Sequence, residues 1–146
     1  MGDVGFYYLP YVDVLIDRFP NVRFVCLKRD RLQMVRSYMA KSGLKNPWST
    51  EPHRGPYPRR DGWDKCYPKH NLPKERALNH YWDDYYHTAK AFHKKYPGRF
   101  RIWRVESALN TLAGQIAVLQ FAGVRKQRTM VFNVGLQINR LVARKR

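Results

Sequence analysis

An arginine and a serine that follow an apolar segment are the residues of this chain best suited to bind a phosphate group. Residues 22–28 are short, β-prone and nearly continuous in apolar side chains, which predicts a buried strand. Arg29 comes directly after it, and Ser37 lies eight residues later in the next predicted helix. Ligands of open α/β sheets bind beyond the carboxyl ends of the strands. There a guanidinium offers a planar fork of donors, a hydroxyl adds a hydrogen bond, and the helix N-terminus favours an anion.

The elements that would position these residues alternate between helix and strand. Apolar residues at helical spacing predict helices over residues 8–18, 74–96 and 107–123, the last with Ser107 as its N-cap. A further helix begins at Asp30 as N-cap, and its predicted apolar stripe consists of Leu32, Val35, Tyr38 and Met39. Residues 99–105 alternate basic and apolar side chains, which predicts a strand with one buried face. The order indicates an α/β domain with a parallel sheet. Two predicted strands are too few for a stable open sheet of that type.

A long segment, residues 43–73, interrupts this alternation. Six prolines forbid a long regular element there, and tryptophans and tyrosines are interleaved with arginines and lysines. A loop of this length inside a compact domain is usually functional or disordered. Its aromatic content favours an ordered segment that docks on the domain.

The length of 146 residues and the net charge of +17 limit the class of protein. The length suits one domain, and the charge predicts an anionic partner. Glu106 is the last acidic residue, so the chain ends in a basic C-terminal tail. Cys26 and Cys66 form no disulfide framework and have no metal-ligand spacing, so we predict no metal and a buried Cys26. With neither a secretory signal nor a membrane-spanning run, a soluble, cytoplasmic protein is the default expectation, which a preceding segment would change.

Arg29 and Ser37 resemble the 3′-phosphate site of the sulfotransferase family that uses 3′-phosphoadenosine 5′-phosphosulfate (PAPS). That family has a strand-end arginine, usually followed by Asp-Pro or Asn-Pro, and a serine eight residues later; here Arg31 replaces the proline. The resemblance covers most of the chain in the same order. It extends to the Tyr/Leu/Pro-rich residues 6–11, the Trp/Tyr-rich residues 81–86, and residues 103–110 and 121–124.

The resemblance implies a three-layer, P-loop-type α/β domain over residues 1–146, incomplete at its N-terminus. The implied reaction is transfer of a sulfuryl group from PAPS to a hydroxyl or amine acceptor, with PAPS or its bisphosphate product on Arg29 and Ser37. The loop over residues 43–73 would cover the acceptor, and its composition suits a carbohydrate. Nothing here resembles the family's Gly/Ser/Thr-rich 5′-phosphosulfate loop, so we expect little turnover by this chain alone. Asp3 is the candidate base, in a Gly-Asp pair that resembles the Gly-Glu of some relatives, whereas Tyr8 stands where others have a histidine.

Other interpretations stay open from the residues alone. Basic side chains interleaved with aromatics also suit a nucleic-acid-binding module, and a non-catalytic sulfotransferase remnant would bind neither ligand. Among individual residues, Glu106 would orient the turn from strand to helix, and residues 125–128 only superficially resemble a nucleotide-covering loop. We expect Tyr81, Trp82 and Tyr85 to pack in the core rather than to stack on adenine. We expect His80, Asp84 and His87 to face solvent rather than to bind a metal.

Overall fold

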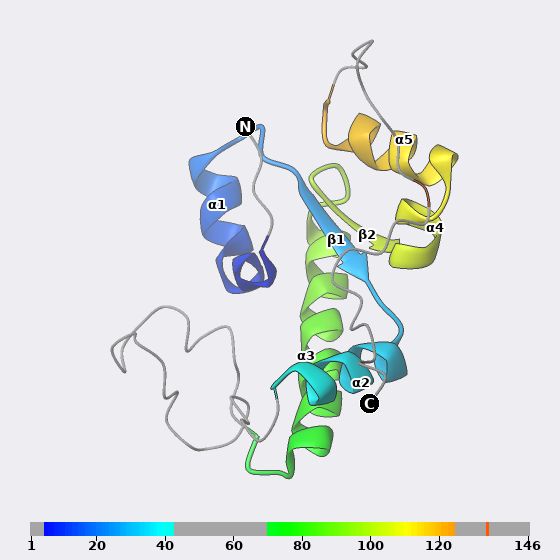
Figure 1. The fold of residues 1–146 in the computed structure, drawn as a ribbon. Coiled ribbons are helices and arrows are strands. Elements are labelled where there is room, and N and C mark those ends of the chain that lie inside the picture. Colours follow the sequence, from blue (N-terminus) through cyan, green and yellow to red (C-terminus); the bar gives the residue numbers. More distant parts are fainter. Residues whose placement is uncertain (1–4, 43–69, 125–133, 135–146) are drawn as a thin grey trace.

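The computed structural model describes residues 5–42, 70–124 and 134, and Figure 1 shows how their elements are arranged. Strands β1 (Phe24–Lys28) and β2 (Phe100–Arg104) form a parallel two-stranded sheet, in register from Phe24 opposite Phe100 to Lys28 opposite Arg104. The predicted mixed α/β character and parallel pairing are therefore confirmed. Parallel strands require a long crossover connection, and its described residues include helices α2 and α3.

Helix α3 (Lys74–Lys95) runs along one face of the sheet (Figure 1) and contributes residues to both hydrophobic clusters of the core. Alternate strand residues point to it: Cys26 and Phe100 are buried, whereas Arg101 is exposed. The predicted one-sided burial of the second strand is thus confirmed at these positions. The prediction that the first strand is fully buried is wrong, because Leu27 on its other face is 37% exposed.

Helix α2 (Arg31–Ser42) begins where predicted, since the Asp30 carboxylate accepts a hydrogen bond from the Gln33 amide at 3.0 Å. Its buried face is shifted from the predicted stripe. Met34 and Val35 are buried against the N-terminal half of α3. Leu32 (62% exposed) and Met39 (38% exposed) lie outside that contact, because the position of α3 decides which side of α2 is covered.

The predicted helix over residues 8–18 is two elements: a 3-10 helix, η1 (Phe6–Tyr11), followed by helix α1 (Val12–Arg18). Pro10 lies inside η1, and a proline cannot donate the hydrogen bond that continues an α-helix. Val12 and Ile16, four residues apart, are buried in the same core as α3 and the sheet.

The predicted helix over residues 107–123 is also divided, into α4 (Val105–Leu109) and α5 (Leu112–Phe121). The prediction that Ser107 caps it is wrong: Ser107 lies inside α4, and its hydroxyl donates to the Arg104 carbonyl at 3.1 Å. The N-cap of α5 is Thr111, whose hydroxyl oxygen accepts from the Gly114 amide. A Cβ at Gly114 would lie 1.8 Å from the Ser107 carbonyl oxygen, so glycine is required for this close approach.

Helix α5 ends as predicted at Gly123, which has a φ of +77°. The Val124 amide donates to the Leu119 carbonyl and the Gly123 amide to the Gln120 carbonyl, at 2.9 and 3.0 Å. This pair of bonds is a Schellman motif, which satisfies the last carbonyls of a helix and needs a residue with positive φ.

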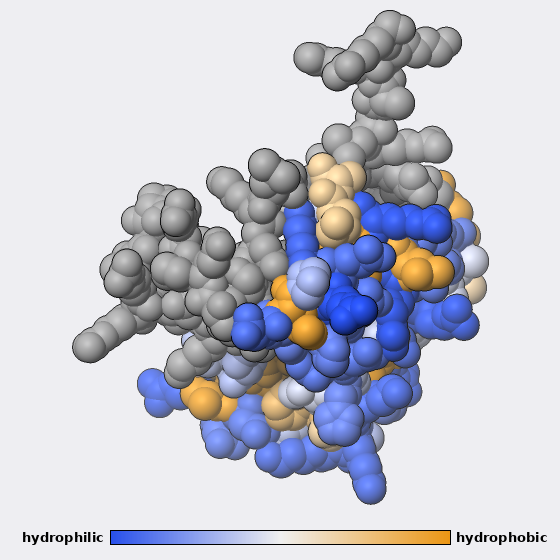
Figure 2. Space-filling model, turned by 90° about the horizontal axis from the view of Figure 1, so that it is seen from below, coloured by the Kyte–Doolittle hydropathy of each residue, from blue (hydrophilic) through white to orange (hydrophobic). Residues whose placement is uncertain are grey.

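The face of the molecule seen from below is mostly hydrophilic, with separate hydrophobic side chains rather than one continuous patch (Figure 2). None of the helices within the described ranges is long and apolar enough to span a membrane. Of the predicted loop over residues 43–73, residues 43–69 lie outside the described part of the chain.

Candidate anion-binding site

The candidate site is the turn from β1 into α2, formed by Arg29 and Asp30. Asp30 caps α2, so the chain reverses from strand to helix within two residues. The free amides at the start of a helix carry partial positive charge. The turn therefore presents Arg29 beside a helix N-terminus, as the sequence predicts.

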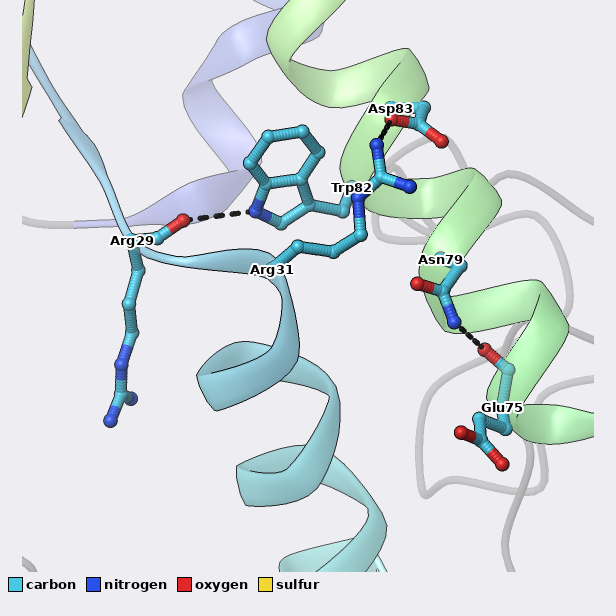
Figure 3. A network of polar contacts seen from close by, with 6 residues as sticks. All are labelled: Arg29, Arg31, Glu75, Asn79, Trp82 and Asp83. Carbon is cyan, nitrogen blue, oxygen red and sulfur yellow. Dashed lines mark hydrogen bonds and ion pairs between the residues drawn. The ribbon is translucent and has the colours of Figure 1, made fainter.

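Two side chains of α3, Trp82 and Tyr86, hold the backbone of Arg29, and Figure 3 shows the bond from Trp82. The Trp82 indole Nε1 donates to the Arg29 carbonyl oxygen at 3.0 Å. The Tyr86 hydroxyl accepts from the Arg29 amide at 3.3 Å and donates to the Leu27 carbonyl at 2.9 Å. Both polar backbone groups of Arg29 are thus satisfied by α3, and the turn is fixed to the longest helix in the described chain.

Burial raises the pKa of Tyr86 to about 12, although the Arg29 backbone bond acts in the opposite direction. Its phenol is therefore protonated at neutral pH and keeps both bonds to the turn. Burial likewise raises the pKa of Cys26, on β1, to about 12, which makes it an inert thiol. The prediction that Cys26 is a small buried hydrophobe is confirmed.

The two basic neighbours of Arg29 contact side chains of α3. The Lys28 ammonium lies 4.9 Å from the Trp82 ring centroid and 5.5 Å from that of Tyr86. The Arg31 guanidinium lies 4.8 Å from the Trp82 ring centroid and pairs with the Asp83 carboxylate. Cations over aromatic rings are attracted by the ring quadrupole, so both charges have partners within the protein.

The guanidinium of Arg29 differs from both. Figure 3 shows its side chain pointing away from Trp82, Arg31 and α3. Arg29 is exposed, and within the described residues its guanidinium has no hydrogen-bond or ion-pair partner. It is therefore free to bind an anion with its full set of donors.

Ser37, the second predicted ligand, lies half-buried on α2, the helix that the turn enters. It is seven residues beyond Asp30, which at 3.6 residues per turn puts it about two turns along the helix and nearly in line with that cap. Arg29 and Ser37 thus belong to the same strand-to-helix unit. The described contacts include no hydrogen bond to the Ser37 hydroxyl.

Several other sequence-predicted residues are not at this turn. Asp3 and residues 125–128 lie outside the described part of the chain. Glu106 is half-buried in the first turn of α4, the first helix after β2. His80, Asp84 and His87 are exposed, as the interpretation of a solvent-facing side of α3 predicts. His70 lies 3.6 Å from Asp84, yet no group of three metal-binding side chains occurs within the described ranges.

The role of Trp82 and Tyr86 at the turn was missed by sequence reasoning. The sequence predicts that Trp82 packs in the core with Tyr81 and Tyr85, and Tyr86 appears only within the Trp/Tyr-rich residues 81–86. Tyr81 and Tyr86 are buried, and Trp82 and Tyr85 are half-buried. The available signal was the spacing of Trp82 and Tyr86 by four residues on one helix, since both side chains carry a polar group that seeks a partner when buried. An open depression on this side of α3 is lined by Trp82, Asp83, Asp84, Tyr86, His87 and Lys90.

Comparison of the chain with protein-family models, with curated proteins and with solved structures gives no match. The functional argument therefore rests on the residues and geometry of the turn.

Proposed function

We propose that the chain binds the 3′-phosphate of PAPS at Arg29 and Ser37 and serves the transfer of a sulfuryl group to a hydroxyl or amine acceptor. The single observation that carries this proposal is the free guanidinium of Arg29 at the carboxyl end of a parallel strand. The backbone of Arg29 is held by α3, whereas its charge has no partner among the described residues.

The arrangement suits a terminal phosphate in particular. The guanidinium can donate two parallel hydrogen bonds to phosphate oxygens, the amides at the start of α2 add partial positive charge, and the Ser37 hydroxyl can donate one bond. A phosphate dianion is favoured over a neutral ligand because each of these groups is a donor. Parallel pairing through a helical crossover fits the proposed three-layer, P-loop-type α/β domain.

For the chemical step, the proposal names fewer residues. In-line sulfuryl transfer depends on positioning of donor and acceptor, stabilisation of the leaving oxygen by a cation, and a base that takes the acceptor proton. Asp3 is the proposed base, and the segment over residues 43–73 is proposed to bind the acceptor, with carbohydrate as its suggested class. We propose no metal in this step.

The test is calorimetric binding of adenosine 3′,5′-bisphosphate, with 5′-AMP as the control nucleotide that lacks the 3′-phosphate. We expect the bisphosphate to bind more tightly to the wild type and this preference to be lost in Arg29→Ala. Arg36→Ala is the matched control, because it removes the same charge from an exposed position on α2.

Equal binding of both nucleotides by the wild type would contradict the proposal. If that binding also weakens steeply with salt and is exceeded by binding of oligonucleotides, the basic nucleic-acid-binding alternative is favoured instead. Binding of neither ligand would favour the non-catalytic remnant.

A further inference from the structure

We infer that Trp82 and Tyr86 are positioning residues for Arg29, and that their hydrogen bonds to its backbone determine how well the chain distinguishes a 3′-phosphate. This inference rests on the proposed function and adds the part of the structure that gives the site its selectivity. It concerns residues that do not touch the nucleotide themselves and that act through Arg29.

The geometry singles out Arg29 among three nearby cations. Its amide and carbonyl are both bonded to α3, by Tyr86 at 3.3 Å and Trp82 at 3.0 Å. A flexible arginine loses conformational freedom when it binds an anion, and this loss weakens binding. Fixing the backbone before the ligand arrives reduces this cost for Arg29.

The same two aromatic rings make cation–π contacts with the two cations that could compete with Arg29 for an anion. Lys28 lies over the rings of both Trp82 and Tyr86, and Arg31 lies over that of Trp82 and pairs with Asp83. Of these three cations, Arg29 is the one whose charged group has no partner among the described residues (Figure 3). Trp82 and Tyr86 thus hold the backbone of Arg29 and bind the charged groups of Lys28 and Arg31. This arrangement favours one defined position for the phosphate.

The test uses the ratio of the affinities for adenosine 3′,5′-bisphosphate and 5′-AMP, measured for Tyr86→Phe and Trp82→Phe. Tyr86→Phe removes both hydrogen bonds of the hydroxyl but keeps the ring, and Trp82→Phe removes the donor to the carbonyl. We expect each substitution to lower the ratio about fivefold to tenfold, the size expected for losing one or two neutral hydrogen bonds that preorganise the site. Partial unfolding would lower both affinities together and leave the ratio unchanged.

The matched control is Tyr96→Phe. Tyr96 follows the C-terminal end of α3, ten residues beyond Tyr86, and its hydroxyl donates to Asp13 at 2.6 Å and not to the Arg29 turn. This variant loses a comparable phenolic hydrogen bond, so we expect reduced thermal stability with an unchanged affinity ratio.

The outcomes separate this inference from the proposed function. A wild type that prefers the bisphosphate, together with Tyr86→Phe and Trp82→Phe variants that keep this preference, would overturn the positioning role and leave the proposed function standing. A wild type without any preference would overturn the proposed function, and the positioning role with it. A lowered ratio in both variants, but not in Tyr96→Phe, supports the inference.

Discussion

Arginines at the two ends of the sheet have opposite roles. At the amino ends of the strands, Arg23 donates to the Phe121 carbonyl at 2.7 Å, and Arg99 donates to the carbonyls of Pro20 and Ile16 at 3.2 and 3.4 Å. At the carboxyl end of β1, the guanidinium of Arg29 has no such acceptor among the described residues.

The polarity of the helices explains this difference. Helices α1 and α5 end near the amino ends of the strands, and their last turns expose carbonyl oxygens that accept from Arg99 and Arg23. Helix α2 begins at the carboxyl end of β1 and exposes amide donors, which cannot pair with a guanidinium. The comparison teaches that Arg23 and Arg99 stabilise the fold where they reach carbonyls at and just after helix ends, whereas Arg29 is available to a ligand where a helix begins.

The largest expected effect that tests this comparison is on binding. Arg29→Ala should weaken binding of adenosine 3′,5′-bisphosphate about a hundredfold, because two charge-assisted hydrogen bonds are lost, each worth about 1.5–3 kcal/mol before compensation. The free energy of unfolding should change by less than about 0.5 kcal/mol, as for other exposed positions. Calorimetry measures the affinity, and urea unfolding measures the free energy of unfolding. If Arg29→Ala lowers the stability and keeps the affinity, Arg29 stabilises the fold and does not bind the ligand.

Arg99→Ala should show the opposite behaviour. We expect the free energy of unfolding to fall by about 1–2 kcal/mol, since two carbonyls lose a charged donor, while the affinity for the bisphosphate is retained. Arg18→Ala, another exposed arginine, serves as control and should change stability by less than about 0.5 kcal/mol. Chemical denaturation of the three proteins measures this; equal stabilities for Arg99→Ala and Arg18→Ala would show that the carbonyl contacts contribute nothing.

A smaller effect is expected at the second ligand of the site. Ser37→Ala should weaken bisphosphate binding about fivefold, through the loss of one hydrogen bond, and should leave binding of 5′-AMP unchanged. Ser107→Ala removes a hydroxyl from α4 and is the matched control. Should both variants bind like the wild type, the 3′-phosphate would have to be held by Arg29 and the amides of α2 alone.

The smallest expected effect concerns the contact between α1 and the C-terminal end of α3, which is independent of the anion site. Hydrogen bonds from Tyr96 and Lys95, chiefly that of Tyr96, hold the pKa of Asp13 below its ordinary value of 3.8. A carboxylate with a lowered folded-state pKa stabilises the fold above its unfolded-state pKa, and this contribution is lost as the pH falls through the folded-state value.

Thermal unfolding of the wild type and Asp13→Asn between about pH 6 and about pH 2 measures this contribution. The wild type should be more stable at the higher pH, and the difference should shrink as the pH falls. A difference that does not depend on pH would show that Asp13 acts as a hydrogen-bond acceptor without a contribution from its charge.

Much of the fold could be predicted because local patterns determine it. The continuous apolar run of β1, the Asp30 cap, the amphipathic stripe of α3 and the end of α5 at Gly123 are all confirmed. One failure occurred where a local pattern has two solutions, and others arose at Pro10 and where tertiary packing decided which face is buried. Residues 107–123 fit one long helix by spacing, yet the Thr111 cap and the close approach at Gly114 divide it.

The sequence by itself determined the type and spacing of Arg29 and Ser37, and their location after a strand and on a helix, because strand and helix periodicity are local properties. Only the tertiary structure decided which cations remain available. Lys28, Arg29 and Arg31 are equivalent as charges in the sequence, and the packing of α3 against the turn holds Lys28 and Arg31 on Trp82 while Arg29 points away. This selection depends on contacts between residues more than fifty positions apart, which no local pattern contains.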